Sequence, residues 1–177
     1  RAREDDKLEP IGWYGNLKVV AERMVLAAHQ VHGLPYTLVR PSALFGARCV
    51  SRRVVQIFIE NCLDGQPLKV AGEGAEKLDF SYIEDWAHGL LLVLSRPEAV
   101  NNTFNIARGD ARSLNDLVGV LRDHFPHLVV EPEPRDMLMP LRDTLDCSRA
   151  RTLLGYAPQW PLERGIAALV EWYRGAS

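Results

Sequence analysis

Segments with a helical period alternate with short β-rich runs along almost the whole of this 177-residue chain. The first helical segment spans Tyr14 to His32, where apolar residues recur every three or four positions, and Gly33 follows as a C-terminal cap. The run YTLVR at 36–40 comes next and has the composition of a buried strand that Pro41 ends. Such alternation predicts an α/β fold with short strands.

Small polar residues mark the starts of further helices. Ser51 is placed to cap a helix that Gly65 ends, and Asp85 is placed to cap a helix that reaches Leu94. The spacing S-x-x-D at 113–116 predicts a capping box in front of another apolar stripe. These caps predict where three helices begin.

The remaining elements follow from shorter patterns. Strand-like runs occur at 68–70, 79–83, 103–107 and 128–130, and closing helices are expected at 146–154 and from Pro161 onward. The stretch that contains Pro132, Pro134 and Pro140 predicts an ordered surface loop.

Composition excludes several classes of protein. With 21 Lys and Arg against 23 Asp and Glu, the chain lacks the broad positive field of a nucleic-acid or anionic-membrane binder. No apolar run is long enough to span a membrane, and the charged N-terminus is not a secretory signal. The three cysteines are far apart, as is typical of reduced thiols, so we expect a cytoplasmic protein. His29 and His32 lack a recognisable third ligand, so no metal site is predicted.

The most suggestive chemical pattern is Y-x-x-x-K at Tyr14 and Lys18. Residues four apart share one side of a helix, so the ammonium can stabilise the phenolate of the tyrosine. Such a tyrosine can exchange a proton with a substrate hydroxyl while a hydride leaves or reaches the same carbon. The lysine keeps donors for the ribose of a nicotinamide cofactor. The alternative is a solvated helix surface with no chemistry.

Five sequence segments, taken in their order along the chain, indicate which family this Tyr–Lys pattern belongs to. They are YGNLKVVAE, LVRPSALFGAR, VAGEGAEKLDFSYIEDWAHG, FNIARGDARSLNDL and LDCSRARTLLGYAPQWPLERGI. Together they resemble the extended short-chain dehydrogenase/reductase family, in its NAD-dependent epimerase/dehydratase branch that acts on nucleotide sugars. The resemblance runs from about Glu4 to Tyr173.

The resemblance implies a role for particular residues. Tyr14 is the implied acid/base and Lys18 its partner on the nicotinamide ribose, with both in contact with NAD (NADP is the alternative). Pro41, Ser42 and Phe45 are implied cofactor contacts, since the family's loop after the Arg-Pro pair passes the nicotinamide. Each of these three is equally well explained as part of a turn that ends a strand.

At the positions where the family binds its substrate, this sequence differs from the family's pattern. Ala43 stands where the family commonly has an Asn for the substrate diphosphate, and Leu78 stands where it usually has an Arg. Lys77 is one residue earlier and points to the opposite side of a strand. Arg135, Arg142 and Lys77 are therefore the candidates for compensating charge, although each also fits an ordinary surface residue.

The chain has no strand followed by a glycine-rich pyrophosphate turn, and Gly72-Glu73-Gly74 does not fit one. We therefore expect the C-terminal portion of a doubly wound Rossmann-type parallel sheet plus a small α/β substrate domain. Residues 1–66 are the expected last βα units of the NAD(P)-binding domain. Residues 67–177 are expected to be mainly substrate-binding, with segments that return to the first domain.

Such a portion would expose strand edges and apolar helix surfaces. The expected partners are thus a nucleotide-sugar substrate and either a second copy or the missing N-terminal half, with no nucleic acid and no membrane. The leading hypothesis is an NAD(P)-dependent nucleotide-sugar epimerase or dehydratase. The alternatives are a reductase of a substrate without a nucleotide and a non-catalytic module of the same fold.

Overall fold

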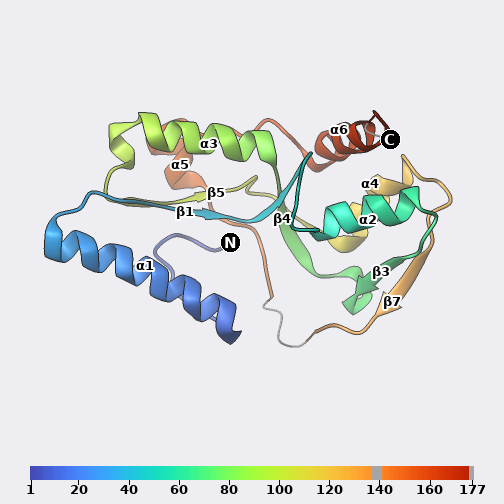
Figure 1. The fold of residues 1–177 in the computed structure, drawn as a ribbon, viewed down its shortest axis with the longest axis horizontal. Helices are drawn as coiled ribbons and strands as arrows, with labels where there is room; N and C mark the ends of the chain where they lie inside the picture. Colours follow the sequence, from blue (N-terminus) through green and yellow to red (C-terminus); the bar gives the residue numbers. More distant parts are fainter. Residues whose placement is uncertain (137–140, 176–177) are drawn as a thin grey trace.

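The computed structural model describes residues 1–136 and 141–175, and the chain is drawn in Figure 1. The helices are α1 Gly12–His32, α2 Val54–Leu63, α3 Ile83–Ser95, α4 Leu114–Arg122, α5 Ser148–Leu154 and α6 Leu162–Gly175. The strands are β1 Thr37–Pro41, β2 Ala43–Phe45, β3 Leu68–Ala71, β4 Lys77–Tyr82, β5 Asn102–Ile106, β6 Ala111–Ser113 and β7 Val130–Glu133. Short 3-10 turns, η1 Gly72–Gly74 and η2 Pro97–Ala99, complete the elements.

Strands β1 and β5 form a parallel pair with helices on both sides. The register runs from Thr37 opposite Asn102 to Pro41 opposite Ile106. Helix α1 lies against one side of the pair, and α3 and α5 lie against the other (Figure 1). Parallel strands covered on both sides are the arrangement of a doubly wound α/β fold, so the fold class predicted from the alternation is confirmed.

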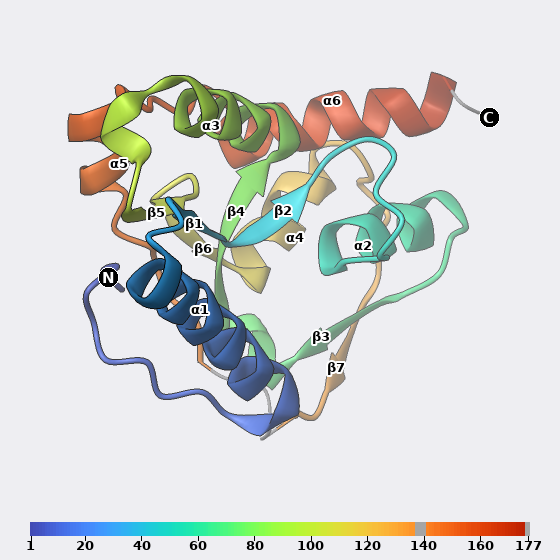
Figure 2. The same ribbon diagram turned by 60° about the vertical axis from the view of Figure 1, so that its left-hand side comes forward.

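A second group of strands carries the larger core. Strands β2, β4 and β6 form one sheet, with β2 parallel and β6 antiparallel to β4, and β3 pairs in parallel with β7. Helices α2, α4 and α6 surround these strands (Figure 2). Their apolar sides supply the fully buried core residues Ile59, Leu117, Leu121 and Ile166. Burial of such a side chain contributes about 1.5–3 kcal/mol relative to its exposure.

The capping box predicted at 113–116 is confirmed. The Ser113 hydroxyl accepts a bond from the Asp116 backbone N–H at 3.0 Å, and the Ser113 N–H donates to the Asp116 carboxylate at 2.8 Å. This reciprocal pair satisfies N–H groups that the first turn of α4 would otherwise leave open.

Two other predicted caps are wrong. Helix α2 begins after Arg53, and the Ser51 hydroxyl accepts a bond from the Arg53 side chain instead of from the helix. Helix α3 begins after Tyr82, so Asp85 lies within its first turn. The Asp85 carboxylate is occupied elsewhere, because it accepts the backbone N–H groups of residues 159 and 160 at 2.6 and 2.9 Å.

The predicted loop after the strand-like run at 128–130 is partly wrong. Strand β7 extends to Glu133, so Pro132 lies within a strand, opposite Val70. A proline is tolerated there because β7 pairs with β3 alone in this part of the chain and therefore lies at an edge. Pro140, the last proline of the predicted loop, lies outside the described residues.

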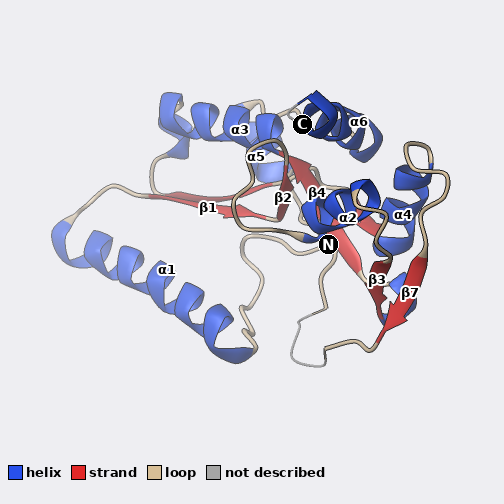
Figure 3. Cartoon of the chain, turned by 45° about the vertical axis from the view of Figure 1, so that its right-hand side comes forward, coloured by secondary structure: helices blue, strands red, loops and turns tan. Residues whose placement is uncertain are grey.

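Helix α1 has no buried residue in this chain. It lies apart from the other helices (Figure 3), and its apolar residues Trp13, Leu17 and Met24 are 87%, 64% and 68% exposed. Strand β1 has β5 on one edge and no described strand on the other. The expectation that the chain exposes an apolar helix surface and a strand edge is confirmed.

Candidate active site

Tyr14 and Lys18 lie one turn apart on the same side of α1. The Lys18 Nζ is 5.5 Å from the centre of the Tyr14 ring, as the four-residue spacing predicts. Tyr14 is 74% exposed. Within the described residues, Lys18 has no ion-pair partner. Both polar groups are therefore accessible to a ligand.

The direction of α1 places this pair at one end of the β1–β5 sheet. Helix α1 runs antiparallel to β1, so its first turn lies at the same end as the carboxyl end of β1 (Figure 1). Ligands of doubly wound sheets bind at the carboxyl ends of the strands. The pair thus lies at the end of the sheet where a ligand is expected.

A side-chain pair that the sequence analysis missed ties α1 to β1. The Glu22 carboxylate accepts two bonds from the Arg40 guanidinium, from Nε at 2.9 Å and from Nη2 at 2.6 Å. The side chains are 23% and 22% exposed, and Arg40 also donates to the Glu4 carbonyl oxygen at 3.0 Å. The hydrogen bond to Glu22 outweighs burial and raises the pKa of Arg40.

This pair sets the rotation of α1 about its axis. Glu22 follows Lys18 by four residues, so Tyr14, Lys18 and Glu22 share one side of the helix. Arg40 directly precedes Pro41, so the bond holds that side toward the end of β1. A sequence signal was present, namely a Glu in register with the Tyr and Lys, and an Arg next to the strand-ending Pro.

The three expected cofactor contacts take different positions. Pro41 ends β1 and is exposed, and Ser42 is half-buried in the link to β2. Both lie at the same end of the sheet as the first turn of α1. Phe45 is buried in the core, where its ring lies edge-on to Tyr82 at 5.4 Å between centres.

The expected substrate contacts Arg135, Ala43 and Leu78 lie beside η1, on β2 and on β4, respectively. Arg135 lies over the η1 turn, since a Cβ added to Gly72 would meet its side chain at 3.4 Å. Gly72 has a left-handed backbone (φ +57°), which also favours glycine at this position. Ala43 is half-buried in β2, opposite Phe80, and Leu78 is buried in the core.

Lys77 and Arg142 are exposed and belong to neighbouring segments. Lys77 begins β4, and Arg142 directly precedes Asp143. The Thr144 backbone N–H lowers the pKa of Asp143 against the opposing effect of desolvation, and the N-terminal ammonium and Lys77 lower it further. Lys77 therefore lies near the Arg142–Asp143 segment. The structure thus places Arg135 beside η1 and Lys77 near the Arg142–Asp143 segment.

The described residues contain no group of three or more His, Cys, Asp or Glu side chains that could hold a metal ion. Among the helices in the described ranges, none is long and apolar enough to cross a membrane.

Comparison with known proteins identifies the family. The model of the NAD dependent epimerase/dehydratase family matches residues 1–107. The chain belongs to this family. The match includes α1 with Tyr14 and Lys18, the β1–β2 link, and β5.

Several relatives of this family member are enzymes of nucleotide sugars. A dTDP-glucose 4,6-dehydratase of Streptomyces antibioticus is 31% identical over 97% of this chain and 51% of its own length. The structure of a UDP-glucose 4-epimerase of Thermotoga maritima with UDP-glucose superposes with a TM-score of 0.89 at 29% identity, and covers 99% of this chain and 57% of that one. The dTDP-glucose 4,6-dehydratase of Streptomyces venezuelae, solved with NAD bound, gives 0.91 at 27%, with 98% and 54% covered.

The matches cover only part of each relative. The chain spans about half the length of the curated relatives.

Proposed function

We propose that this chain supplies the proton-transfer pair of an NAD-dependent enzyme that epimerises or dehydrates a nucleotide-diphosphate sugar. The observation that carries the proposal is the Tyr14–Lys18 pair, in which the Lys18 Nζ lies 5.5 Å from the centre of the Tyr14 ring. The Glu22–Arg40 bond holds this side of α1 toward the end of β1. Family membership and the activities named for the relatives support it.

Each residue of the pair has a defined task. The Tyr14 hydroxyl exchanges a proton with a sugar hydroxyl, and the Lys18 ammonium stabilises the phenolate formed in that exchange. The exposed face of α1 lets both groups reach a substrate at once. Dehydration needs further acid and base groups, which this proposal does not assign.

The residues present fit the nicotinamide end of NAD. Lys18 has ammonium donors without an ion-pair partner in the described parts of the chain, and ribose hydroxyls are suitable acceptors. Pro41 and Ser42 lie at the same end of the sheet and would border the ring, whereas Phe45 would act from within the core. NAD, when bound, supplies a reversible hydride acceptor. The NAD named for the Streptomyces venezuelae neighbour favours it over NADP.

The substrate diphosphate would be held by charge at the η1–β4 part of the fold. Arg135, Arg142 and Lys77 are the candidates, because Ala43 and Leu78 cannot donate a hydrogen bond from their side chains. That same lack favours a second candidate function, an NAD(P)-dependent reductase of a substrate without phosphates.

We further propose that the exposed side of α1 and the free edge of β1 are covered by additional protein. The half of the relatives that this chain does not match is the first candidate, and a second copy of the chain is the other. In this proposal residues 1–66 belong to the cofactor-binding domain and residues 67–177 mainly to the substrate-binding domain. The three free cysteines suit a reducing compartment such as the cytoplasm.

The test is product analysis with the full-length protein. UDP-glucose and dTDP-glucose are incubated with the protein and NAD, and the sugars are followed by proton NMR. A C4 epimer or a 4-keto-6-deoxy sugar supports the proposal. Consumption of reduced cofactor with a phosphate-free carbonyl compound, and no response to UDP, supports the reductase. No thermal stabilisation by millimolar NAD would indicate a non-catalytic module.

A further inference from the structure

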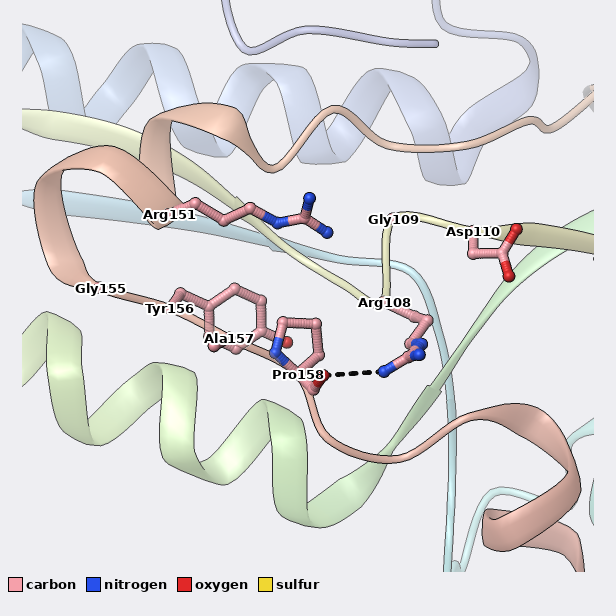
Figure 4. A pocket seen from close by; sticks show the side chains of 8 residues that line it. All are labelled: Arg108, Gly109, Asp110, Arg151, Gly155, Tyr156, Ala157 and Pro158. Atoms are coloured by element: carbon pink, nitrogen blue, oxygen red, sulfur yellow. Dashed lines mark hydrogen bonds between the residues drawn. The ribbon is translucent and has the colours of Figure 1, made fainter.

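A hollow of about 470 Å³ lies between α5, the loop after β5 and the chain that follows α5 (Figure 4). Arg108, Arg151, Tyr156 and Pro158 are among the residues that line it. Helix α5 covers the side of β1–β5 opposite α1 (Figure 1). The hollow is therefore separate from the Tyr14–Lys18 pair, and the proposed reaction does not use it.

Two guanidinium groups flank the hollow from different elements. Arg108 follows β5 and Arg151 belongs to α5, and their side chains approach the hollow from opposite sides (Figure 4). Arg108 uses Nη1 to bind the Pro158 carbonyl oxygen at 2.8 Å. Arg151 has no side-chain hydrogen bond or ion pair with any residue that the structure describes. Most of their donors are available to a ligand.

Acidic groups lie near the hollow as well as the two arginines. The buried Asp79 carboxylate accepts the Gly109 N–H at 3.1 Å, and Asp79 and Asp85 add to the effect of burial in raising the pKa of Tyr156. Asp110 is the acidic residue among those that line the hollow, and Figure 4 shows its carboxylate directed away from both guanidinium groups. Gly109 gives Arg151 its room, because a Cβ there would lie 3.2 Å from Arg151 Nη2. The backbone of Gly109 is also left-handed, at φ +79°.

A buried hydroxyl without a partner adds a third donor. Tyr156 is 1% exposed, and its hydroxyl has no hydrogen-bond partner in the described chain. A buried hydroxyl left unpaired is energetically unfavourable, so an acceptor close by would stabilise this site. Figure 4 shows the hydroxyl pointing toward the Arg108 side of the hollow. Burial raises the pKa of Tyr156, so the group keeps its proton and can donate it.

We propose that this hollow binds a small phosphate anion, either free phosphate or a phosphate monoester. A carboxylate offers two oxygens in one plane, whereas the oxygens of a phosphate point in three or four directions. A phosphate can therefore accept from guanidinium groups of two different elements and from a hydroxyl at the same time.

The experiment is calorimetric titration of the full-length protein with inorganic phosphate and, separately, with glycerol 3-phosphate, at constant ionic strength. Saturating NAD and UDP fill any nucleotide sites first, so binding at those sites does not contribute. Succinate serves as the carboxylate probe. Because the titration follows phosphate itself, its outcome is independent of whether the protein turns over nucleotide sugars.

The proposal predicts saturable binding of at least one phosphate probe, and much weaker binding of succinate. Arg151→Gln should weaken that binding about tenfold or more, since a charge-assisted bond is lost. Arg122→Gln, an exposed arginine of α4, should leave it unchanged. Tyr156→Phe, which keeps the ring, should weaken it several-fold with the thermal midpoint retained. Absence of saturable binding, equal binding by Arg151→Gln, or equal binding of succinate would overturn the proposal.

Discussion

The Glu22 carboxylate accepts two hydrogen bonds from the Arg40 guanidinium and so fixes how α1 lies on β1. Glu22 extends the side of α1 that carries Tyr14 and Lys18, and Arg40 immediately precedes the end of β1. One side-chain pair therefore links the packing of the helix to the placement of the two groups proposed to move a proton.

Removal of the Glu22 charge tests this link. Glu22→Gln should lower the free energy of unfolding by about 1–2 kcal/mol, because a half-buried bidentate pair loses its charge. Glu9→Gln breaks the exposed Lys7–Glu9 pair and should change stability by less than about 0.5 kcal/mol. Urea denaturation of both variants measures the difference. Equal stabilities would show that the Arg40 bond contributes no more than a surface pair.

Asp85 should be a structural residue. Its buried carboxylate accepts two backbone N–H groups, from Gln159 and Trp160. Asp85→Asn turns one acceptor oxygen into a donor and should cost about 2 kcal/mol of unfolding free energy. The adjacent exposed Glu84→Gln is the matched control and should be within about 0.5 kcal/mol of the parent. Thermal melts in which both variants behave alike would contradict this role.

The three thiols should react in a defined order. Burial tends to raise the pKa of Cys49, but hydrogen bonds from the Ser51 hydroxyl and from the Ser51 and Arg53 N–H groups outweigh it and lower the pKa. Burial raises the pKa of Cys62, and it raises the pKa of Cys147 to about 11. Because the thiolate is the reactive form, iodoacetamide at pH 7.5 should label Cys49 first and Cys147 last.

Mass spectrometry of the digested protein measures this order. In urea the three sites should react at similar rates, which is the control for local sequence effects. Labelling of native Cys147 as fast as Cys49 would contradict the predicted order.

The raised pKa of Cys147 also predicts that the folded protein loses stability at alkaline pH. In the unfolded chain the thiol loses its proton near pH 9, whereas the folded protein keeps it to about pH 11. The unfolded state is therefore favoured as the pH rises through this window, by up to about 1.4 kcal/mol per pH unit. Cys147→Ala should show a shallower decline between pH 9 and 11 in urea titrations. An identical slope would contradict the burial of this thiol.

Sequence patterns predicted the features that depend on residues close together in the chain. The capping box of α4 depends on residues three apart, and the Tyr14–Lys18 spacing depends on one helical turn, so both could be read from the sequence. The Asp85 cap was wrong because its carboxylate bonds to residues 159 and 160, far along the chain. The strand at Pro132 was missed because only its pairing with β3 makes an edge position there.

In the candidate site too, features set by neighbouring residues were predicted and contacts between distant segments were not. The sequence predicted that Tyr14 and Lys18 lie one helical turn apart, but the Glu22–Arg40 bond required the antiparallel packing of α1 on β1. The hollow beside Arg151 depends on a loop after β5 that meets α5, and no spacing pattern predicts that contact.

The most direct test of the account is the turnover number of Tyr14→Phe in the full-length protein with UDP-glucose and dTDP-glucose. Loss of the hydroxyl should lower kcat by about 10²–10⁴-fold, the usual contribution of an acid/base group, with the thermal midpoint retained because Tyr14 is exposed. Tyr36→Phe, which removes a hydroxyl from a tyrosine packed edge-on against His29, should stay within twofold of the parent. A Tyr14→Phe enzyme with the parent's kcat would contradict the proposed role of the Tyr14–Lys18 pair.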